Sequence, residues 1–346
     1  MIREALQKLV EGGKLDQPEA AQVAEEIMTG EATPAQIAGF LIALRMNVES
    51  VDEITGMAKV MREKALHVLT DGEVLDVVGT GGDAKHTFNI STASALVAAA
   101  AGVPVAKHGN RAASGVFGAA DVLEANGVKL ELKPESVSRC IDEVNIGFMF
   151  APAFHPAMRF AGPVRRELGV RTIFNILGPL TNPAGASYQV LGVGQPEPIL
   201  GKPQPELGEM MAHVLANLGT KHSWVVRGDD GLDELTTTST TQVWEVIGGR
   251  VRHFEVSPED AGLGRVALSD IQGRDASDMT ALFHQALSEG PSAAKDIVML
   301  NAAAAMVVVG RAPDLRAGVA IARETIDSGE PLRTLHALAK LSQTLE

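Results

Sequence analysis

Three glycines stand within four residues at Gly79-Thr80-Gly81-Gly82, and Asp83 follows them directly. Because glycine has no Cβ, this glycine turn (residues 79–83) favours positive φ angles and lets the backbone approach a ligand closely. Residues 89–92, Asn-Ile-Ser-Thr, then supply several N-cap candidates for a helix over 93–101. Unpaired N–H groups at the start of a helix, together with its dipole, attract anions. This stretch therefore predicts an anion-binding site.

A second polar stretch, Lys107-His108-Gly109-Asn110-Arg111, follows an expected strand over 103–106. The glycine turn itself follows an expected strand over 74–78. A helix that connects two adjacent parallel strands brings their carboxyl ends to the same edge of the sheet. We therefore expect the glycine turn and residues 107–111 to face one crevice, which would take an anionic, polyoxygenated ligand.

Two common nucleotide-binding motifs are absent around the glycine turn. The dinucleotide motif G-x-G-x-x-G would need a glycine at Ala84, and a Walker A loop would need Gly-Lys-Ser or Gly-Lys-Thr. A glycine turn without either motif is a weak signal, because it is also compatible with a simple tight turn.

The second candidate for chemistry is the acid pair Asp233-Glu234, which comes shortly after an expected strand over 223–226. Its spacing is not that of an EF-hand loop, so a solvated acidic turn and a functional pair both remain possible from the local sequence. The nine histidines show no zinc-binding spacing, and no Ser-His-Asp arrangement can be argued. Cys140 is expected to lie within a helix as a small core residue.

Several segments together carry a resemblance that none carries alone. Residues 79–83, Thr87-Phe88-Asn89-Ile90-Ser91-Thr92 and residues 107–111, at this spacing, closely resemble the anthranilate phosphoribosyltransferase family. These enzymes join anthranilate to 5-phosphoribosyl 1-pyrophosphate (PRPP), the second step of tryptophan biosynthesis from chorismate. The resemblance extends over nearly the whole chain and is strongest over 76–121 and 155–183.

The resemblance implies roles for three groups of residues. Those expected at PRPP are Gly79, Gly82, Asp83, Thr87, Asn89, Ile90, Ser91, Thr92, Lys107, His108, Gly109, Asn110, Arg111, Gly115 and Ala119. Those expected at anthranilate are Gly79, Asn110, Arg165 and Gly178, and those expected at Mg²⁺ are Ser91, Asp233 and Glu234, with two ions per monomer. For Arg165, a solvated or ion-paired helix residue is the alternative. We assign no general base, because the aromatic amine already has a free lone pair.

The pattern of elements predicts an α/β protein: a small N-terminal helical domain, and a larger domain with a mostly parallel central sheet flanked by helices. Helices are expected over 35–46, 51–66, 118–126, 136–144, 158–168, 207–218, 278–287, 293–309 and 316–328, besides two nearer the N-terminus. A strand is expected over 146–150, irregular chain over 151–156, and a hairpin over 243–253 that turns at Gly248-Gly249. We place the domains at 1–70, joined in space by about 155–185, and at 71–346.

Composition limits the partners and the compartment. A net charge of −13 argues against a general binder of nucleic acid or of an anionic membrane. The longest apolar stretches, 93–106 and 297–309, are shorter than the roughly 20 residues that span a bilayer. The single cysteine excludes an intramolecular disulfide and suits a reducing compartment, so a cytoplasmic protein is expected. The resemblance adds a homodimer formed through the helical domain.

Two other functions remain open. A pyrimidine nucleoside phosphorylase-like enzyme would use the same crevice for phosphate and a nucleoside. A non-catalytic relative that binds nucleic acid would be expected to show a basic surface and to lack the acid pair.

The chain departs from the family at two places. The family usually has a Lys or Arg shortly after Arg111, whereas this chain reads Ser114-Gly115-Val116-Phe117-Gly118. Either Val116 and Phe117 pack inward, or the PRPP site is weakened there; our hypothesis is a local weakening. The second departure is the segment 195–206, whose four prolines predict an inserted surface loop.

Overall fold

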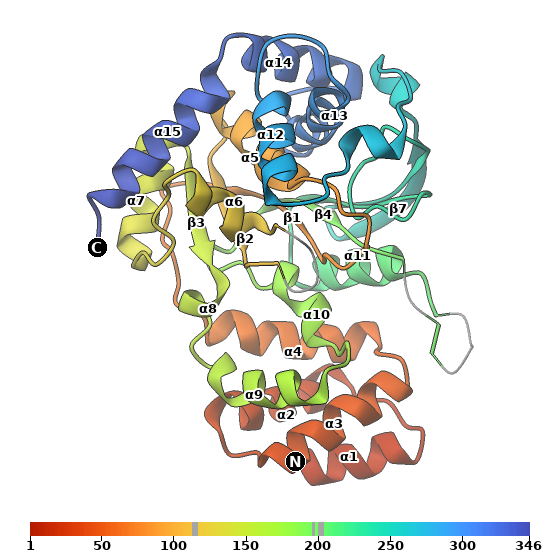
Figure 1. Cartoon of the computed structure of the whole chain (residues 1–346). Coiled ribbons are helices and arrows are strands. Elements are labelled where there is room, and N and C mark those ends of the chain that lie inside the picture. The colour runs from red at the N-terminus through yellow and green to blue at the C-terminus, as the bar shows by residue number, and fades with distance from the viewer. Residues whose placement is uncertain (113–116, 196–197, 200–203) are drawn as a thin grey trace.

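The computed structural model describes residues 1–112, 117–195, 198–199 and 204–346. Its N-terminal part is a bundle of α1 (Ile2–Val10), α2 (Gln17–Thr29), α3 (Pro34–Met46) and α4 (Val51–Glu63). Two later helices, α9 (Met158–Leu168) and α10 (Phe174–Leu177), lie beside this bundle (Figure 1). Segments about 100 residues apart in the chain thus form one helical layer.

Capping explains where the bundle helices begin. Asp16, Thr33 and Ser50 are the N-caps of α2, α3 and α4, and each forms a capping box with the side chain three residues on. Pro34 occupies the first turn of α3, where its missing N–H costs no helical hydrogen bond. These starts agree with the expected helices over 35–46 and 51–66, although α4 ends three residues earlier, at Glu63.

A seven-stranded sheet forms the larger part of the molecule. Its strands are β1 (Leu75–Gly79), β2 (Val105–Gly109), β3 (Ile146–Phe150), β4 (Tyr188–Gly192), β5 (His222–Gly228), β6 (Thr241–Ile247) and β7 (Arg250–Val256), in the order β3-β2-β1-β4-β5-β6-β7. The first five strands in this order are parallel, and β6 and β7 are antiparallel additions at one edge. The expected hairpin turn at Gly248-Gly249 is confirmed, and both glycines have positive φ.

Helices cover both faces of this sheet (Figure 1). On one side lie α5 (Ile90–Ala100), α12 (Ala276–Ala286), α13 (Ala293–Val308) and α14 (Leu315–Asp327). On the other side α11 (Leu207–Asn217) separates the sheet from the helical bundle. The strands around β3 are flanked by α6 (Ala119–Ala125), α7 (Pro134–Val144) and the C-terminal α15 (Glu330–Gln343).

Alternate strand residues belong to two different hydrophobic cores. Val190 and Trp224 pack in the core under α5 and α13, whereas their neighbours Leu191 and Val225 pack in the core shared with α11 and the bundle. Because successive strand side chains point to opposite faces, one sheet stabilises both layers. The expected mostly parallel sheet with flanking helices is thus confirmed.

Four details differ from expectation. Strand β4 and helix α15 were not predicted, and residues 151–154 form a short helix, α8, rather than irregular chain. Pro152 lies in the first turn of α8, a position that proline tolerates. Lys107, His108 and Gly109 belong to β2 rather than to the loop after it.

Some predictions concern segments of the chain rather than single elements. Residues 195, 198–199 and 204–206, the described part of the proline-rich segment, form no helix and no strand; residues 196–197 and 200–203 lie outside the described residues. In the described chain, no helix combines the length and the hydrophobicity that crossing a membrane would require.

Glycine at the end of β4 lets the acid pair approach the sheet. A Cβ on Gly192 would overlap the backbone carbonyl oxygen of Asp233. At the end of the adjacent strand, a Cβ on Gly79 would lie 2.5 Å from the Asp233 carboxylate oxygen Oδ2. Only strands that end without side chains leave room for the loop that carries Asp233.

We expect Gly192→Ala to lower the free energy of unfolding by about 3 kcal/mol, because the new methyl group must displace backbone rather than a flexible side chain. Urea denaturation of the purified variant measures this change. Gly72→Ala is the matched control, since a Cβ there has no atom within 4 Å. An equal effect of both substitutions would contradict the proposed close packing.

Candidate functional site

The glycine turn lies where the order of the strands in the sheet reverses. From β1 the chain moves to β2 and β3 on one side, and from β4 it moves to β5 on the other. The two diverging loops are bonded together: Thr80 N donates to Gly192 O at 2.9 Å, and Gly194 N donates to Thr80 Oγ1 at 3.3 Å. In open α/β sheets a ligand crevice forms at this reversal, outside the carboxyl ends of the strands.

The turn is held by the acid pair rather than by its own hydrogen bonds alone. Gly81 N donates to Asp233 Oδ2 at 2.7 Å, which joins residues 152 positions apart. Asp83 Oδ1 accepts from Lys85 N at 3.1 Å, whereas its Oδ2 is buried without a hydrogen-bond partner. Ala84 adopts a positive φ of 56°, which is uncommon for a residue with a Cβ. The turn thus presents an unpaired carboxylate oxygen beside Asp233.

Burial makes this group of carboxyls electrostatically unfavourable. Burial, and next the charge of Asp83, raises the pKa of Asp233 to about 7. Burial, and next the charge of Asp233, raises the pKa of Glu234 well above its ordinary value. Ser91 N–H partly offsets this by donating to Glu234. Buried carboxylates of like charge favour either a proton or a bound cation.

The donors at this position suit a hard cation. They are carboxylate and hydroxyl oxygens, which Mg²⁺ prefers, and one carboxylate oxygen, Asp83 Oδ2, has no partner. Among the described residues, no three His, Cys, Asp or Glu side chains are close enough to hold a metal on their own. Mg²⁺ commonly binds one or two carboxylates and completes its shell with water and substrate oxygens, so an incomplete protein shell fits it.

Lys107 lies beneath this site rather than in open solvent. Its side chain is buried, and Nζ donates to Val77 O at 2.6 Å and to Ser91 Oγ at 3.2 Å. Burial lowers the pKa of Lys107 to about 8, while Asp76 and Glu234 raise it. The amine therefore orients Ser91 and offsets nearby negative charge.

Two residues that were not among the predicted site residues, Asp76 and Asn182, lie near Lys107 and hold its surroundings in place. Burial raises the pKa of Asp76 to about 6 against the opposing charge of Lys107. Its carboxylate accepts from Asn182 Nδ2 at 2.8 Å and from His108 N at 3.3 Å. One signal was available: Asp76 is the only charged residue in the apolar stretch 74–78.

The side chain of His108, in β2, connects the sheet with the segment around residues 155–178. Its Nε2 lies 3.2 Å from His155 Nε2, and its side chain donates to the backbone of Gly178. Both imidazoles are buried, and burial lowers the pKa of each, to about 3 for His108 and about 4 for His155. The structure thus brings His108 and Gly178 together and adds His155, which was not among the predicted site residues.

The start of α5 presents mainly backbone to the crevice. Asn89 is its N-cap, and Oδ1 accepts from Thr92 N at 3.0 Å. Ile90 and Thr92 have buried side chains, and Thr92 Oγ1 has no hydrogen-bond partner. Thr87 forms an isolated bridge to Gln272. Ile90 can therefore contact a ligand only through its main chain.

The loop after β2 is mostly occupied by internal contacts. Arg111 pairs with Asp121 at 3.0 Å and with Glu124 at 2.7 Å. Asn110 is exposed, and its Oδ1 accepts from Arg111 N at 2.8 Å. Gly109 packs near Phe148, where a Cβ would lie 3.0 Å from its ring.

The departure from the family is resolved only in part. Phe117 and Ala119 pack against the large core. For Phe117, this supports the alternative that the residue packs inward. Gly115 and Val116 lie outside the described residues. Whether the PRPP site is weakened stays a hypothesis.

Arg165 lies on α9, and its guanidinium carbon is 5.2 Å from the centroid of the Phe174 ring. Burial lowers the pKa of Arg165. Within the described chain it makes no ion pair with an acidic side chain, unlike Arg111. The ion-paired alternative for Arg165 thus finds no support.

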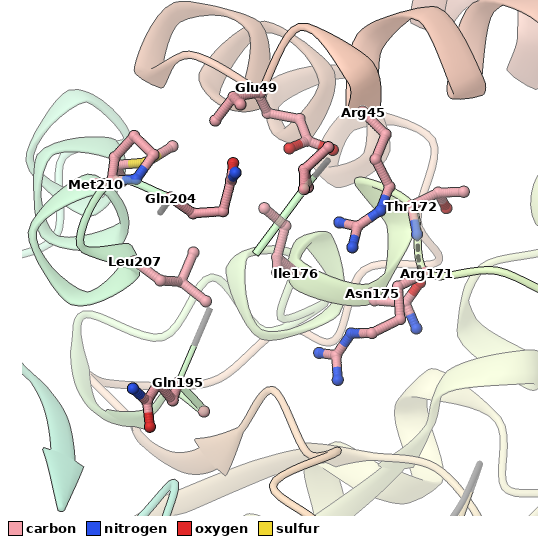
Figure 2. Close-up of a pocket in the computed structure, with 14 residues that line it drawn as sticks. Arg45, Glu49, Arg171, Thr172, Asn175, Ile176, Gln195, Gln204, Leu207 and Met210 are labelled. Atoms are coloured by element: carbon pink, nitrogen blue, oxygen red, sulfur yellow. Dashed lines mark hydrogen bonds between the residues drawn. The ribbon is translucent and has the colours of Figure 1, made fainter. Parts of the chain in front are cut away.

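A small cavity of about 80 Å³ that opens to solvent lies next to these groups (Figure 2). Its lining combines α3 and the α9–α10 region with α11 and the chain after β4: Arg45, Val48, Glu49, Arg171, Thr172, Asn175, Ile176, Gly194, Gln195, Ile199, Gln204, Pro205, Leu207 and Met210. None of the predicted substrate-binding residues lines it. It reaches the glycine turn through Arg171, whose Nη1 donates to Gly82 O at 3.3 Å.

The half-buried acid pair predicts a pH dependence of stability for the metal-free protein. A raised pKa means that the folded state binds a proton more tightly, so the stabilisation present below about pH 4 is lost as pH rises through about 7. We expect Asp233→Asn, which keeps an oxygen acceptor for Gly81 N–H, to exceed the wild type in unfolding free energy by at least about 1 kcal/mol at pH 8. Denaturation in EDTA at pH 5 and pH 8 tests this. The same difference at both values would contradict it.

Comparisons with known proteins agree with this geometry. The sequence matches the Glycosyl transferase family, helical bundle domain, over residues 3–65, and the Glycosyl transferase family, a/b domain, over residues 71–332. The anthranilate phosphoribosyltransferase of Chloroflexus aggregans is 55% identical over 344 residues, which cover 99% of this chain and 98% of that protein.

Two solved structures have the same fold over nearly their whole length. The anthranilate phosphoribosyltransferase of Thermus thermophilus aligns with a TM-score of 0.89 and 44% identity, covering 98% of this chain and 99% of that one. The Saccharomyces cerevisiae enzyme in complex with PRPP and Mg aligns with a TM-score of 0.88 and 26% identity, covering 99% and 98%. The chain therefore belongs to the anthranilate phosphoribosyltransferase family.

Proposed function

We propose that this chain transfers the phosphoribosyl group of PRPP to anthranilate, giving N-(5-phosphoribosyl)anthranilate and pyrophosphate. The observation that carries this proposal is the bond between Gly81 N and half-buried Asp233, which places a glycine turn and an acid pair together where the strand order of the sheet reverses. Family membership agrees with it. The reaction is the second step of tryptophan biosynthesis from chorismate.

Asp233 and Glu234, with Ser91, would hold Mg²⁺, for which we propose two ions per monomer. The support is the oxygen-only donor set, the raised carboxyl pKa values and the unpaired Asp83 Oδ2. When bound, the cation neutralises charge on the pyrophosphate oxygens. The yeast relative in complex with PRPP and Mg supports this choice of ion.

The protein residues themselves position PRPP and stabilise the departing charge. The N–H groups of the glycine turn and of the α5 start would bind phosphate oxygens. As the bond from ribose C1 to the pyrophosphate oxygen breaks, the amine nitrogen of anthranilate forms the new bond to C1 and then loses a proton. No strong general base is needed, and Lys107 contributes by holding Ser91 in place.

Arg165 would bind the anthranilate carboxylate, with Asn110, Gly79 and Gly178 around the same substrate. A planar guanidinium suits a carboxylate because it can donate two parallel hydrogen bonds. Phe174 supports this role because the Arg165 guanidinium lies over its ring, 5.2 Å from the ring centroid. The absence of a carboxylate partner within the described residues leaves these donors available.

The remaining organisation is proposed on the same basis. We place the domain boundary near residue 70, with about 155–185 joining the helical domain. The chain would act as a homodimer through that domain, in the cytoplasm. Exposed apolar side chains on the bundle, Val10, Ile42 and Met46, support an interface there.

A fluorescence assay for phosphoribosyl anthranilate tests the proposed function. Purified protein is mixed with anthranilate, PRPP and Mg²⁺, and EDTA replaces Mg²⁺ in the control. Product that requires all three components supports the proposal. Phosphorolysis of a pyrimidine nucleoside, with no product from anthranilate, would overturn it.

Arg165→Ala should raise the KM for anthranilate roughly 30- to 150-fold, the equivalent of a charge-assisted pair of about 2–3 kcal/mol. The KM for PRPP should change little, and steady-state kinetics with each substrate varied in turn measures both. Arg166→Ala is the matched control, because Arg166 is an exposed arginine on the same helix. Equal effects on the two KM values would place Arg165 elsewhere in the site.

A further inference from the structure

Arg171 approaches the glycine turn from the side of the helical bundle. It lies between α9 and α10, and Figure 2 shows its side chain at the cavity beside Asn175 and Arg45. Nη1 donates to Gly82 O at 3.3 Å. A Cβ on Gly82 would overlap that nitrogen, and it would lie 3.2 Å from the guanidinium carbon. The guanidinium therefore rests directly against the backbone of the turn.

The partners of Arg171 differ from those of the other cations nearby. The Lys107 amine is buried against a carbonyl and a hydroxyl, and Arg111 is paired with two carboxylates. Lys85 extends toward Gly231, on the acidic side of the turn. Arg171 has one neutral carbonyl and, among the described residues, no acidic partner. A guanidinium has five N–H donors, so four remain for another acceptor.

The turn thus has two unlike sides. One side faces the half-buried acid pair, with Gly81 N on Asp233 and Asp83 Oδ2 unpaired. The other side carries the positive guanidinium of Arg171. A pyrophosphate group laid along the turn could meet a carboxylate-bound cation on one side and bidentate N–H donors on the other.

We propose that Arg171 is a further substrate-binding residue, which holds the pyrophosphate group of PRPP from the side of the helical bundle. This inference rests on the proposed function for the identity of the substrate. It has a structural consequence, because an anion bound in this way contacts both the α9–α10 region and the glycine turn at the end of β1. PRPP binding therefore draws the helical bundle and the sheet together. A merely structural contact would need only the Gly82 carbonyl.

The test compares Arg171→Gln and Arg171→Lys with Arg166→Gln as the control. Titration calorimetry with inorganic pyrophosphate and Mg²⁺ measures Kd, and steady-state kinetics measures the KM for each substrate. For Arg171→Gln we expect both the pyrophosphate Kd and the KM for PRPP to rise about 10- to 100-fold, with the KM for anthranilate within about twofold. Arg171→Lys keeps the charge but loses the planar fork, so an intermediate increase is expected.

Unchanged pyrophosphate affinity in Arg171→Gln, even with a lower Tm, would overturn the proposal and leave Arg171 as a contact between domains. If Arg171→Gln does not fold, Arg171→Lys decides: wild-type Kd and KM for PRPP would overturn the proposal. Failure of the proposed function is distinguishable. If the wild type forms no phosphoribosyl anthranilate but binds pyrophosphate through Arg171, the proposed acceptor reaction fails while the anion contact stands.

Discussion

The structure depends on holding two adjacent, half-buried carboxyls, Asp233 and Glu234, directly against the glycine turn. Burying charge without full compensation is costly, and the raised pKa values of both groups express that cost. Several unrelated features make the burial possible: strand ends without side chains at Gly79 and Gly192, and the amine of Lys107 beneath. Such a concentration of partly buried charge is typical of functional sites rather than of structural cores.

Local chemistry made part of the fold predictable. The glycine turn, the N-cap at Asn89 and the capping residues Thr33 and Ser50 act over three or four residues, so their sequence pattern is sufficient. Strand β4 was missed because Tyr188–Gly192 includes buried Gln189 and lies between segments rich in glycine and proline. Its stability comes from β1 and β5 on either side, which no local pattern shows.

The same limit applies within the site. Residue types and spacing indicated an anion site and an acid pair, and the family resemblance supplied the substrates. The partners that orient these groups could not be predicted, because Asn182 meets Asp76 across 106 residues and Asp233 meets Gly81 across 152. Lys107 was expected at PRPP, yet the strand that carries it buries its amine beneath Ser91. Strand direction, which depends on the whole sheet, decides which polar side chains reach solvent.

These features connect stability to ligand binding. Without a cation, the acid pair lowers the stability of the folded state above its raised pKa, and the unpaired Asp83 oxygen adds to that cost. A cation that binds together with a polyanion removes the repulsion between the carboxylates. The repulsion that destabilises the metal-free fold therefore increases the affinity for the cation. Two residues in the chain around α9 take part: His155 contacts His108 in β2, and Arg171 contacts Gly82 in the glycine turn. Binding at the glycine turn is therefore coupled to the distance between the helical bundle and the sheet, because residues from both parts form these contacts.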